Sequence, residues 1–341
     1  LSHLAAFFYA VFALWPENCR NNCPENNDYT IIFLLLMNTF SVTILGSSAA
    51  IAARNRGLTA QVLRYGRELF LIDCGEGTQF QLKCYKIPMG HINRIFISHL
   101  HGDHFFGLIG LLSTWHLLRR VQALDIYAPA PLEHILKLQL EASGTELNYP
   151  LTFYPLSAEI PQLILDHPQL EVSTLPLIHR VPTTGFLFKE KQPPRRINPQ
   201  TIQHYGVPFQ AIESLRMGAD FTEPSGKVIP NAELTLPGPE SRSYAYCSDT
   251  AYNESLIPLI AGSTVLYHEA TFMHDRASSA AEKGHSTSVQ AATIASKAKV
   301  GRLLLGHFSA RYEEMGPLLE EAQSIFKESV IVEDGITYNI Q

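Results

Sequence analysis

The densest group of chemically competent side chains is the run Ser98-His99-Leu100-His101-Gly102-Asp103-His104. Its three imidazoles and one carboxylate are donors that suit Zn²⁺ or Mn²⁺. Because the run contains no thiolate, it favours a catalytic zinc site over a structural one. Ligands this close surround a metal only if the backbone turns sharply, and we expect Gly102 to supply that freedom. The alternative is a chance polar turn at a helix start, with Asp103 as its cap.

Further metal-binding side chains occur where predicted strands end. His179, Asp249 and His307 come directly after strand-like runs, or one residue beyond them. These runs are Leu175–Ile178, Tyr244–Cys247 and Arg302–Leu305, and a fourth run, Thr264–Tyr267, leads into His268 and Glu269. Polar residues at strand ends gather at one rim of an α/β sheet. Each residue alone is explained as a satisfied polar group, whereas together they indicate further metal ligands.

The pattern of strands and helices that must position these side chains predicts an α/β fold. Two apolar runs, Leu69–Asp73 and Arg94–Ser98, are typical of buried strands, and Phe105–Arg120 has helical length. The first strand ends in a glycine-rich turn that contains Asp73 and Glu76. These two carboxylates either support ligand histidines or only form the turn.

Composition bounds the class of protein. With 341 residues, 46% of them hydrophobic and 17% charged, the chain suits one large α/β domain or two small ones. Ordinary glycine and proline contents exclude collagen-like and broadly disordered chains. A net charge of −6 argues against a protein whose whole surface is basic for nucleic-acid binding, but not against a local basic patch. Five cysteines at irregular positions favour a reducing compartment, so we expect a cytoplasmic protein.

The N-terminal residues differ from the rest. We interpret residues 1–36 as a non-native or poorly ordered extension, with Met37 as the natural start. The apolar run Leu4–Trp15 is shorter than the roughly 20 residues that span a bilayer, which makes a membrane anchor the less favoured alternative. Cys19 and Cys23 form a lone pair of cysteines and are weak evidence for zinc.

From about Phe40 to the C-terminus the chain resembles ribonuclease Z, short form, of the metallo-β-lactamase fold superfamily. The His-rich run alone identifies only the superfamily. The turn Gly75-Glu76-Gly77-Thr78-Gln79, the segment His268-Glu269-Ala270-Thr271-Phe272 and the segment Gly284-His285-Ser286-Thr287 narrow the resemblance to ribonuclease Z. It implies an α/β fold, the αβ/βα four-layer sandwich, over residues 37–341, with a protruding arm over residues 188–235.

The resemblance also implies how two zinc ions are held, with Mn²⁺ as another possible metal. One ion is assigned to His99, His101 and His179, and the other to Asp103, His104 and His307, with Asp249 as the bridge between them. Such a pair of ions activates water for attack on a phosphodiester. By the same analogy, Asp103 takes the proton from the attacking water.

The leaving group needs a proton, and the resemblance gives that role to His285, with Glu269 orienting its ring. The simpler interpretation of His285 is a residue at a helix entry, beside the cap residue Ser286.

Candidate substrate contacts lie in two segments. The proline-rich segment 189–196 carries Lys189, Lys191, Arg195 and Arg196. It is either a solvated loop or, as the resemblance implies, part of an arm that grips the tRNA elbow. In residues 47–56, Arg54 and Asn55 match the family's phosphate loop, but the expected glycines and proline are missing, which leaves open how the nucleotide beside the cut is held.

Together these features predict a zinc-dependent endoribonuclease that removes the 3′ trailer from precursor tRNA and acts as a homodimer. It would leave a 3′-hydroxyl on the tRNA and a 5′-phosphate on the trailer. The alternatives are a hydrolase of another ester, such as a small phosphodiester, aryl sulfate or thioester, and a catalytically silent RNA-binding relative.

Overall fold

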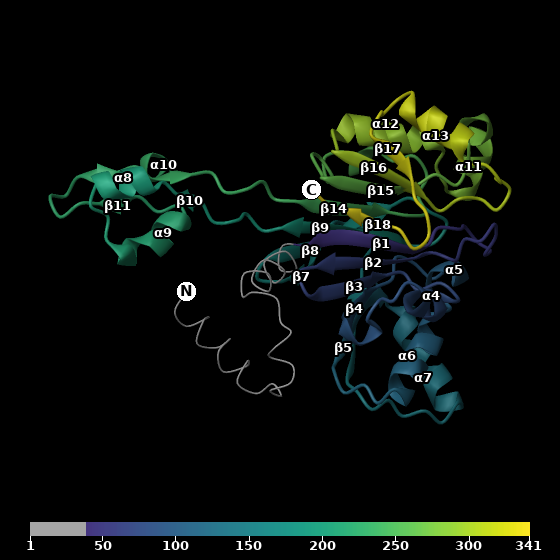
Figure 1. Cartoon of the computed structure of the whole chain (residues 1–341). Coiled ribbons are helices and arrows are strands. Elements are labelled where there is room, and N and C mark those ends of the chain that lie inside the picture. The colour runs from purple at the N-terminus through teal and green to yellow at the C-terminus, as the bar shows by residue number, and fades with distance from the viewer. Residues whose placement is uncertain (1–38) are drawn as a thin grey trace, which may run out of the picture.

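The computed structural model describes residues 39–341 (Figure 1). The interpretation of residues 1–36 as an extension, and the pair Cys19 and Cys23, therefore lie outside the described residues. Among the described residues, no helix has the length and apolar character needed to cross a bilayer.

The first six strands and the last strand form a seven-stranded sheet in the order β18-β1-β2-β3-β4-β5-β6. Strands β1 to β3 pair antiparallel, and β3 to β6 pair parallel. The bounds are β1 Phe40–Gly46, β2 Ala60–Tyr65, β3 Glu68–Ile72, β4 Ile92–Phe96, β5 Leu124–Pro129, β6 Leu151–Leu156 and β18 Thr337–Asn339.

Strands that begin with β7 form a second seven-stranded sheet in the order β17-β16-β15-β14-β9-β8-β7. Strands β14 to β17 are parallel, whereas β7, β8 and β9 join them antiparallel. The bounds are β7 Leu163–Asp166, β8 Leu170–Leu177, β9 Thr183–Glu190, β14 Ser243–Cys247, β15 Val265–Glu269, β16 Arg302–Gly306 and β17 Ser329–Ile331.

The two sheets pack face to face, and helices cover both outer faces (Figure 1). The first sheet is covered by α4 (Thr78–Cys84), α5 (Gly102–Phe105), α6 (Leu108–Leu117) and α7 (Pro131–Ala142). The second is covered by α11 (Ala277–Lys283), α12 (Ser288–Ala298) and α13 (Gly316–Gln323). Short 3₁₀ turns complete the body at η1 (Met89–His91), η3 (Glu254–Leu256) and η4 (His274–Arg276). The expected αβ/βα four-layer sandwich is confirmed.

Aromatic residues fill the space between the sheets. Phe70, Phe96 and Phe188 are buried, and their ring centroids lie 5.3–6.2 Å apart in edge-on or tilted pairs. Close-packed aromatic pairs of this kind stabilise a core beyond their burial alone. This core fixes one sheet against the other, and therefore fixes the side chains at their common edge.

The strand predictions are confirmed, but the single helix predicted over Phe105–Arg120 is wrong in extent. The structure divides this stretch between α5 and α6, with a break at Phe106-Gly107. Gly107 donates its N–H to the carbonyl of Cys74, and a Cβ at Gly107 would lie 2.1 Å from the carbonyl oxygen of Gly75. This close contact ties the break to the turn that follows β3.

An arm projects from the body between β9 and β14 (Figure 1). Residues 188–190 of the predicted arm belong to β9, and extended stretches at 191–195 and 237–242 join the arm to the body. Its elements are β10 (Arg196–Ile197), α8 (Pro199–His204), η2 (Phe209–Ala211), α9 (Ile212–Arg216), β11 (Phe221–Thr222), β12 (Val228–Ile229), α10 (Asn231–Leu234) and β13 (Thr235–Leu236). They enclose a small core of their own around Val207, Leu215, Ile229 and Leu234.

Candidate metal centre and active site

The candidate ligands meet at one edge of the two sheets because the strands that precede them end there. His99 follows β4, His179 follows β8, Asp249 follows β14 and His307 follows β16. In the second sheet β8, β14 and β16 run in the same direction, because β9 pairs antiparallel with both β8 and β14, so their carboxyl ends share an edge. The prediction of a polar rim is confirmed.

One group of potential metal ligands contains His99, His101, His179 and Asp249, whose ligand atoms lie within 4.8 Å of one another. The Nδ1 atom of His101 is 3.0 Å from Nε2 of His99 and 3.2 Å from Nε2 of His179. The Oδ2 atom of Asp249 is 3.6 Å from Nε2 of both His99 and His179. Three imidazoles and one carboxylate oxygen thus converge on a single point.

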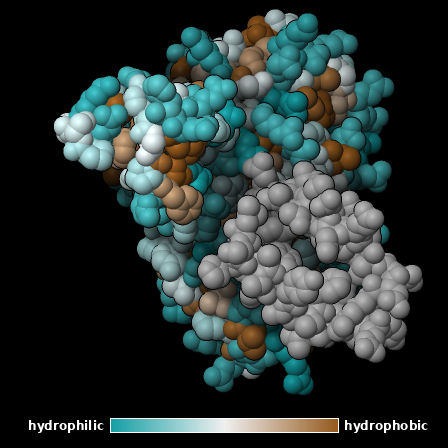
Figure 2. Space-filling model, turned by 60° about the vertical axis from the view of Figure 1, so that its left-hand side comes forward, coloured by the Kyte–Doolittle hydropathy of each residue, from teal (hydrophilic) through white to brown (hydrophobic). Residues whose placement is uncertain are grey.

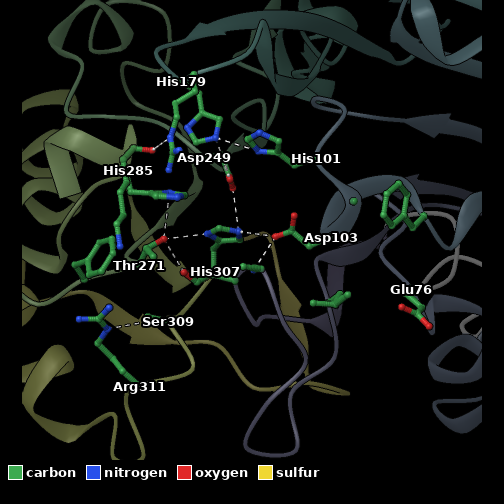
Figure 3. Close-up of a pocket in the computed structure, with 18 residues that line it drawn as sticks. Glu76, His101, Asp103, His179, Asp249, Thr271, His285, His307, Ser309 and Arg311 are labelled. Atoms are coloured by element: carbon green, nitrogen blue, oxygen red, sulfur yellow. Dashed lines mark hydrogen bonds and ion pairs between the residues drawn. The ribbon is translucent and has the colours of Figure 1, made fainter. Parts of the chain in front are cut away.

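A second group contains Asp103, His104 and His307. The Oδ2 atom of Asp103 lies 3.6 Å from Nε2 of both histidines. The other oxygen of Asp249, Oδ1, is 3.2 Å from Nε2 of His104 and 3.0 Å from Nε2 of His307. Each oxygen of Asp249 therefore faces a different histidine group. Figure 3 shows Asp249 between His179 and His307.

The residues fit a pair of divalent cations. His104 and His307 are buried, and their Nε2 atoms have no hydrogen-bond partner among the described residues. Burial lowers the pKa values of His99 and His179, which favours the neutral imidazole that binds metals. His104 is different, because Asp249 and Asp73 raise its pKa despite its burial. A site with unpartnered ring nitrogens and this much negative charge attracts cations.

The remaining ring nitrogens are held by hydrogen bonds that fix the orientation of each ring. His104 Nδ1 donates to Asp73 Oδ2 at 2.8 Å, His99 Nδ1 donates to Ser98 Oγ at 3.0 Å, and His179 Nδ1 donates to the Gly284 carbonyl at 2.7 Å. Such outer contacts set the tautomer and leave the opposite nitrogen for a metal. Of the two interpretations of Asp73, the structure supports a direct contact to a candidate ligand. Glu76 is exposed and lines the pocket instead.

Asp73 is the centre of a fully buried network. Its carboxylate accepts hydrogen bonds from the Ser98 N–H at 2.7 Å, the Ser98 hydroxyl at 2.9 Å and the Tyr246 hydroxyl at 2.6 Å. Tyr246 lies on β14 of the second sheet, so its hydroxyl crosses the interface between the sheets. A buried carboxylate is stable when donors surround it in this way.

A second buried carboxylate, Glu269, holds the other side of the site. It accepts from His285 Nδ1 at 2.9 Å, from the Thr250 N–H at 2.7 Å and from the Thr271 hydroxyl at 2.6 Å. Thr271 Oγ1 also lies 3.0 Å from Nδ1 of His307. The hydroxyl has one proton and two acceptors in reach, Glu269 Oε2 at 2.6 Å and the His307 carbonyl at 2.9 Å. The shorter contact, to a charged group, assigns donation from Thr271 to Glu269, and His307 Nδ1 then donates to Thr271.

Three of the nine described non-glycine residues with positive φ belong to the site at this edge. Asp73, Asp249 and His307 have φ values of 56°, 21° and 57°, in the left-handed region that residues with a Cβ rarely adopt. Strain of about 1–3 kcal/mol per residue is typical of functional sites. The side chain of Asp73 contacts the candidate ligand His104, and Asp249 and His307 are themselves candidate ligands.

The expectation that Gly102 supplies an unusual backbone conformation is wrong. Gly102 begins α5 and is not among the described glycines with positive φ. Its lack of a side chain matters for space, because a Cβ there would lie 2.3 Å from the ring of Phe106. Asp103 does not cap this helix either; it lies within the first turn and its Oδ2 accepts from the Ala50 N–H at 2.8 Å.

The predicted substrate-contact residues are not among the groups of potential metal ligands or the side chains that line the pocket. Lys189 and Lys191 are at the base of the arm, where Lys191 pairs with Asp166. In the arm, Arg195 Nε donates to Thr235 at 2.6 Å and Arg196 Nε donates to the Pro237 carbonyl at 3.2 Å. The loop residues Arg54 and Asn55 have φ values of 54° and 61°, and Arg54 pairs with Glu313.

Sequence reasoning missed the parts played by Thr271 and Tyr246. Thr271 stood inside a recognised motif, His268 to Phe272, without an assigned contact. Tyr246 alternates with Tyr244 along β14, and this spacing of two residues indicated that both face the same side of a strand. The pattern could not show that this side meets Asp73 of the other sheet.

This fold is shared with metallo-β-lactamase fold proteins. The metallo-β-lactamase fold protein YhfI from Bacillus subtilis superposes with a TM-score of 0.62 at 21% identity, covering 89% of this chain and 99% of that one. A family model described as the anti-Pycsar protein Apyc1 matches residues 40–191. The protein is thus a metallo-β-lactamase fold protein with a binuclear-type histidine and aspartate metal site.

Within that class of proteins, sequence similarity points to one family. Ribonuclease Z from Phocaeicola vulgatus is 43% identical over 305 residues, which covers 89% of this chain and 99% of the relative. Human tRNase Z, short form, has a TM-score of 0.64 at 30% identity, covering 88% of this chain and 99% of that one. The chain belongs to the ribonuclease Z family, and it is a metal-dependent endoribonuclease of tRNA 3′ processing. The family and function predicted from the sequence are confirmed.

Proposed function

We propose that this enzyme uses two zinc ions to remove the 3′ trailer from precursor tRNA, leaving a 3′-hydroxyl on the tRNA and a 5′-phosphate on the trailer. The observation that carries the proposal is that the two oxygens of Asp249 face different histidine groups. A carboxylate shared in this way supports two ions rather than one.

The proposed ligands divide into two sets that share Asp249. They are His99, His101 and His179 for one ion and Asp103, His104 and His307 for the other. Five imidazoles against two carboxylates favour zinc over Mn²⁺, which prefers oxygen-rich sites. When bound, the ions would supply an activated water and neutralise charge on the scissile phosphate.

Two proton transfers fall to side chains of this chain. His285 is proposed to donate a proton to the leaving 3′-oxygen, since Glu269 raises the pKa of His285 to about 9 against the effect of burial. An imidazolium at neutral pH is the form that this step requires. Asp103 is proposed to accept the proton of the attacking water; the nearby His307 and His104 lower its pKa despite burial, so it is ionised.

The arm is proposed to bind tRNA at a distance from the cut. Between Arg195 and Leu236 it carries four cationic residues (Arg195, Arg196, Arg216, Lys227) and four acidic ones (Glu213, Asp220, Glu223, Glu233). Binding of tRNA by the arm therefore depends on where the cationic residues lie and not on the net charge of the arm. Hydrophobic patches also lie on it (upper left in Figure 2), and Phe209 is 86% exposed. Exposed aromatic rings stack on nucleic-acid bases.

Charge neutralisation tests the role of the arm. Replacing Lys189, Lys191, Arg195 and Arg196 with glutamine should raise KM for precursor tRNA far more than for a small phosphodiester. Each lost phosphate contact should also lower the salt dependence of binding by roughly 0.9, on the scale known for duplexes. Equal losses on both substrates would contradict the proposed exosite.

A homodimer is proposed, in which the arm of one subunit holds tRNA for the active site of the other. Large exposed hydrophobic side chains on α4, on α6 and just after α6 support an interface there; they are Phe80, Leu117, Leu118 and Val121. Glutamate in place of Leu117 and Leu118 should convert the dimer to a monomer in light scattering. We also propose a cytoplasmic location, which agrees with the free thiols of Cys74, Cys84 and Cys247 among the described residues.

Mapping of product ends tests the proposed function. Metal-replete enzyme should cut a 3′-extended precursor tRNA once, near the discriminator base, and Asp249→Ala should abolish the cut. Turnover of a small phosphodiester without cleavage of precursor tRNA would show that the substrate is another ester. Absence of both activities, together with absence of bound metal, would indicate a silent RNA-binding relative.

A further inference from the structure

The pocket over the metal centre carries its cationic side chains on one side only. It has a volume of about 620 Å³. Apart from the candidate ligands and His285, its charged lining residues are Arg180, Lys283, Arg311 and Glu76. Figure 3 shows Arg311 on the side of His285 and Thr271, and Glu76 on the opposite side of the ligand cluster.

The three cationic residues are linked to the segment that carries His285. Lys283 precedes His285 by two positions, and Arg180 Nε donates to the Lys283 carbonyl at 3.1 Å. The Arg311 guanidinium lies 5.1 Å from the ring centroid of Phe272, and Lys283 Nζ lies 5.6 Å from the same centroid. The cations therefore share one wall of the pocket.

Two of these cations are held in place before any substrate binds. The ring of Phe272 is only 3% exposed, so it provides a fixed surface for both charged groups. Arg311 Nε also donates to Ser309 Oγ at 3.0 Å. Side chains that are already positioned lose less conformational entropy when they bind an anion.

Their charges are not neutralised by carboxylates. Elsewhere on the surface, Lys191 and Lys297 form ion pairs with Asp166 and Glu254. Within residues 39–341, no carboxylate forms an ion pair with Arg180, Lys283 or Arg311. Arginine and lysine in this state are suited to phosphate oxygens.

The opposite wall offers no such contact. It consists of the exposed carboxylate of Glu76 together with apolar side chains such as Leu58 and Phe106. A carboxylate repels a phosphate, and apolar groups do not bind one. Among the side chains that line this pocket, an RNA strand therefore meets three cations on one side of the cut and a carboxylate on the other.

The direction of the strand follows from His285. If His285 donates its proton to the leaving 3′-oxygen, the nucleotide that carries this oxygen lies on the side of His285. That nucleotide is the last one of the tRNA, so the trailer lies on the side of Glu76. We infer that Arg180, Lys283 and Arg311 form a subsite for backbone phosphates on the tRNA side of the cut, and that this subsite does not contact the trailer. This inference rests on the proposed function and on the proposed role of His285.

Binding of the two cleavage products distinguishes the two walls of the pocket. We would measure dissociation constants of a tRNA that ends at the cut and of a 5′-phosphorylated trailer oligonucleotide, for wild type, Arg311→Gln and Lys283→Gln, all loaded with zinc. Each substitution should weaken the tRNA product by roughly tenfold, the effect of one lost charge-assisted contact. Its salt slope should fall by about 0.7, the value for single strands. The trailer should change by less than about twofold, well below the cost of one such contact.

Matched controls keep the outcome interpretable. Lys327→Gln removes the same charge from an exposed site outside the pocket and should leave both dissociation constants unchanged. Equal or larger losses for the trailer would reverse the assigned direction, and unchanged binding of both products would refute the subsite. Failure of the proposed function is recognised separately, because wild-type enzyme would then not cut precursor tRNA at all.

Discussion

Thr271 gives the sharpest test of how the metal centre is supported. Its hydroxyl lies 2.6 Å from Glu269 Oε2 and 3.0 Å from His307 Nδ1, so it links a buried carboxylate to a candidate ligand. Valine has nearly the same shape as threonine but no hydroxyl. Thr271→Val should therefore weaken one metal site while the fold is kept.

The size of the effect follows from the contacts that are lost. A hydrogen bond to a charged group contributes about 1.5–3 kcal/mol, and a buried donor left without a partner costs about 1–3 kcal/mol. Glu269 keeps three other donors, the Thr250 N–H, His285 Nδ1 and the backbone N–H of residue 271, so part of the loss is offset. We expect about 2 kcal/mol at the affected site, which is roughly a 30-fold rise in its metal dissociation constant.

Competition with a chromogenic zinc chelator measures both sites in one titration. One dissociation constant should rise by roughly 30-fold and the other by less than about threefold. Thr271→Ser, which keeps the hydroxyl, should restore the affinity. Thr293→Val removes a threonine hydroxyl that bonds only to a helix carbonyl, and should leave both constants unchanged. Two unchanged constants for Thr271→Val, or failure of serine to restore affinity, would refute the link from Glu269 through Thr271 to His307.

Three further results are expected. Tyr246→Phe removes one of the donors to Asp73, which orients His104, so it should weaken one metal site by roughly tenfold in the same chelator titration. An unchanged titration would contradict this role of Tyr246. His285→Ala should lower kcat on precursor tRNA by about 10²–10⁴-fold but should cost much less with a p-nitrophenyl phosphodiester, whose leaving group needs no proton; equal losses would exclude proton donation. Removal of metal by a chelator should lower the melting temperature, since zinc at 100 times its dissociation constant stabilises the fold by about 2.7 kcal/mol; identical melting curves would show that metal does not bind the folded protein.

The sequence predicted the edge of the sheets where the site lies, because strand periodicity and strand ends are local properties. Runs such as Tyr244–Cys247 showed both where a strand stops and which polar residue comes next. The motif from Gly284 to Thr287 likewise placed His285 just before a helix, but the expected cap residue Ser286 is wrong, because the side chain of Thr287 caps α12.

Contacts between the two sheets could not be predicted in this way. The approach of Tyr246 to Asp73 joins residues on different sheets, and it depends on how the aromatic core packs them together. The need for a glycine at position 102 could not be predicted either. It depends on where the Phe106 ring lies in the folded turn, which the motif does not show. The division of Asp249 between two histidine groups came from family resemblance, and geometry now supports it.

The most direct test of the account is the position of the metal ions themselves. Crystals of zinc-loaded enzyme, measured at the zinc absorption edge, should show two anomalous peaks per chain. One peak should lie among His99, His101 and His179, and the other among Asp103, His104 and His307, with Asp249 in contact with both. A single peak, or a peak that Asp249 does not contact, would contradict the two-metal site on which the proposed cleavage of precursor tRNA rests.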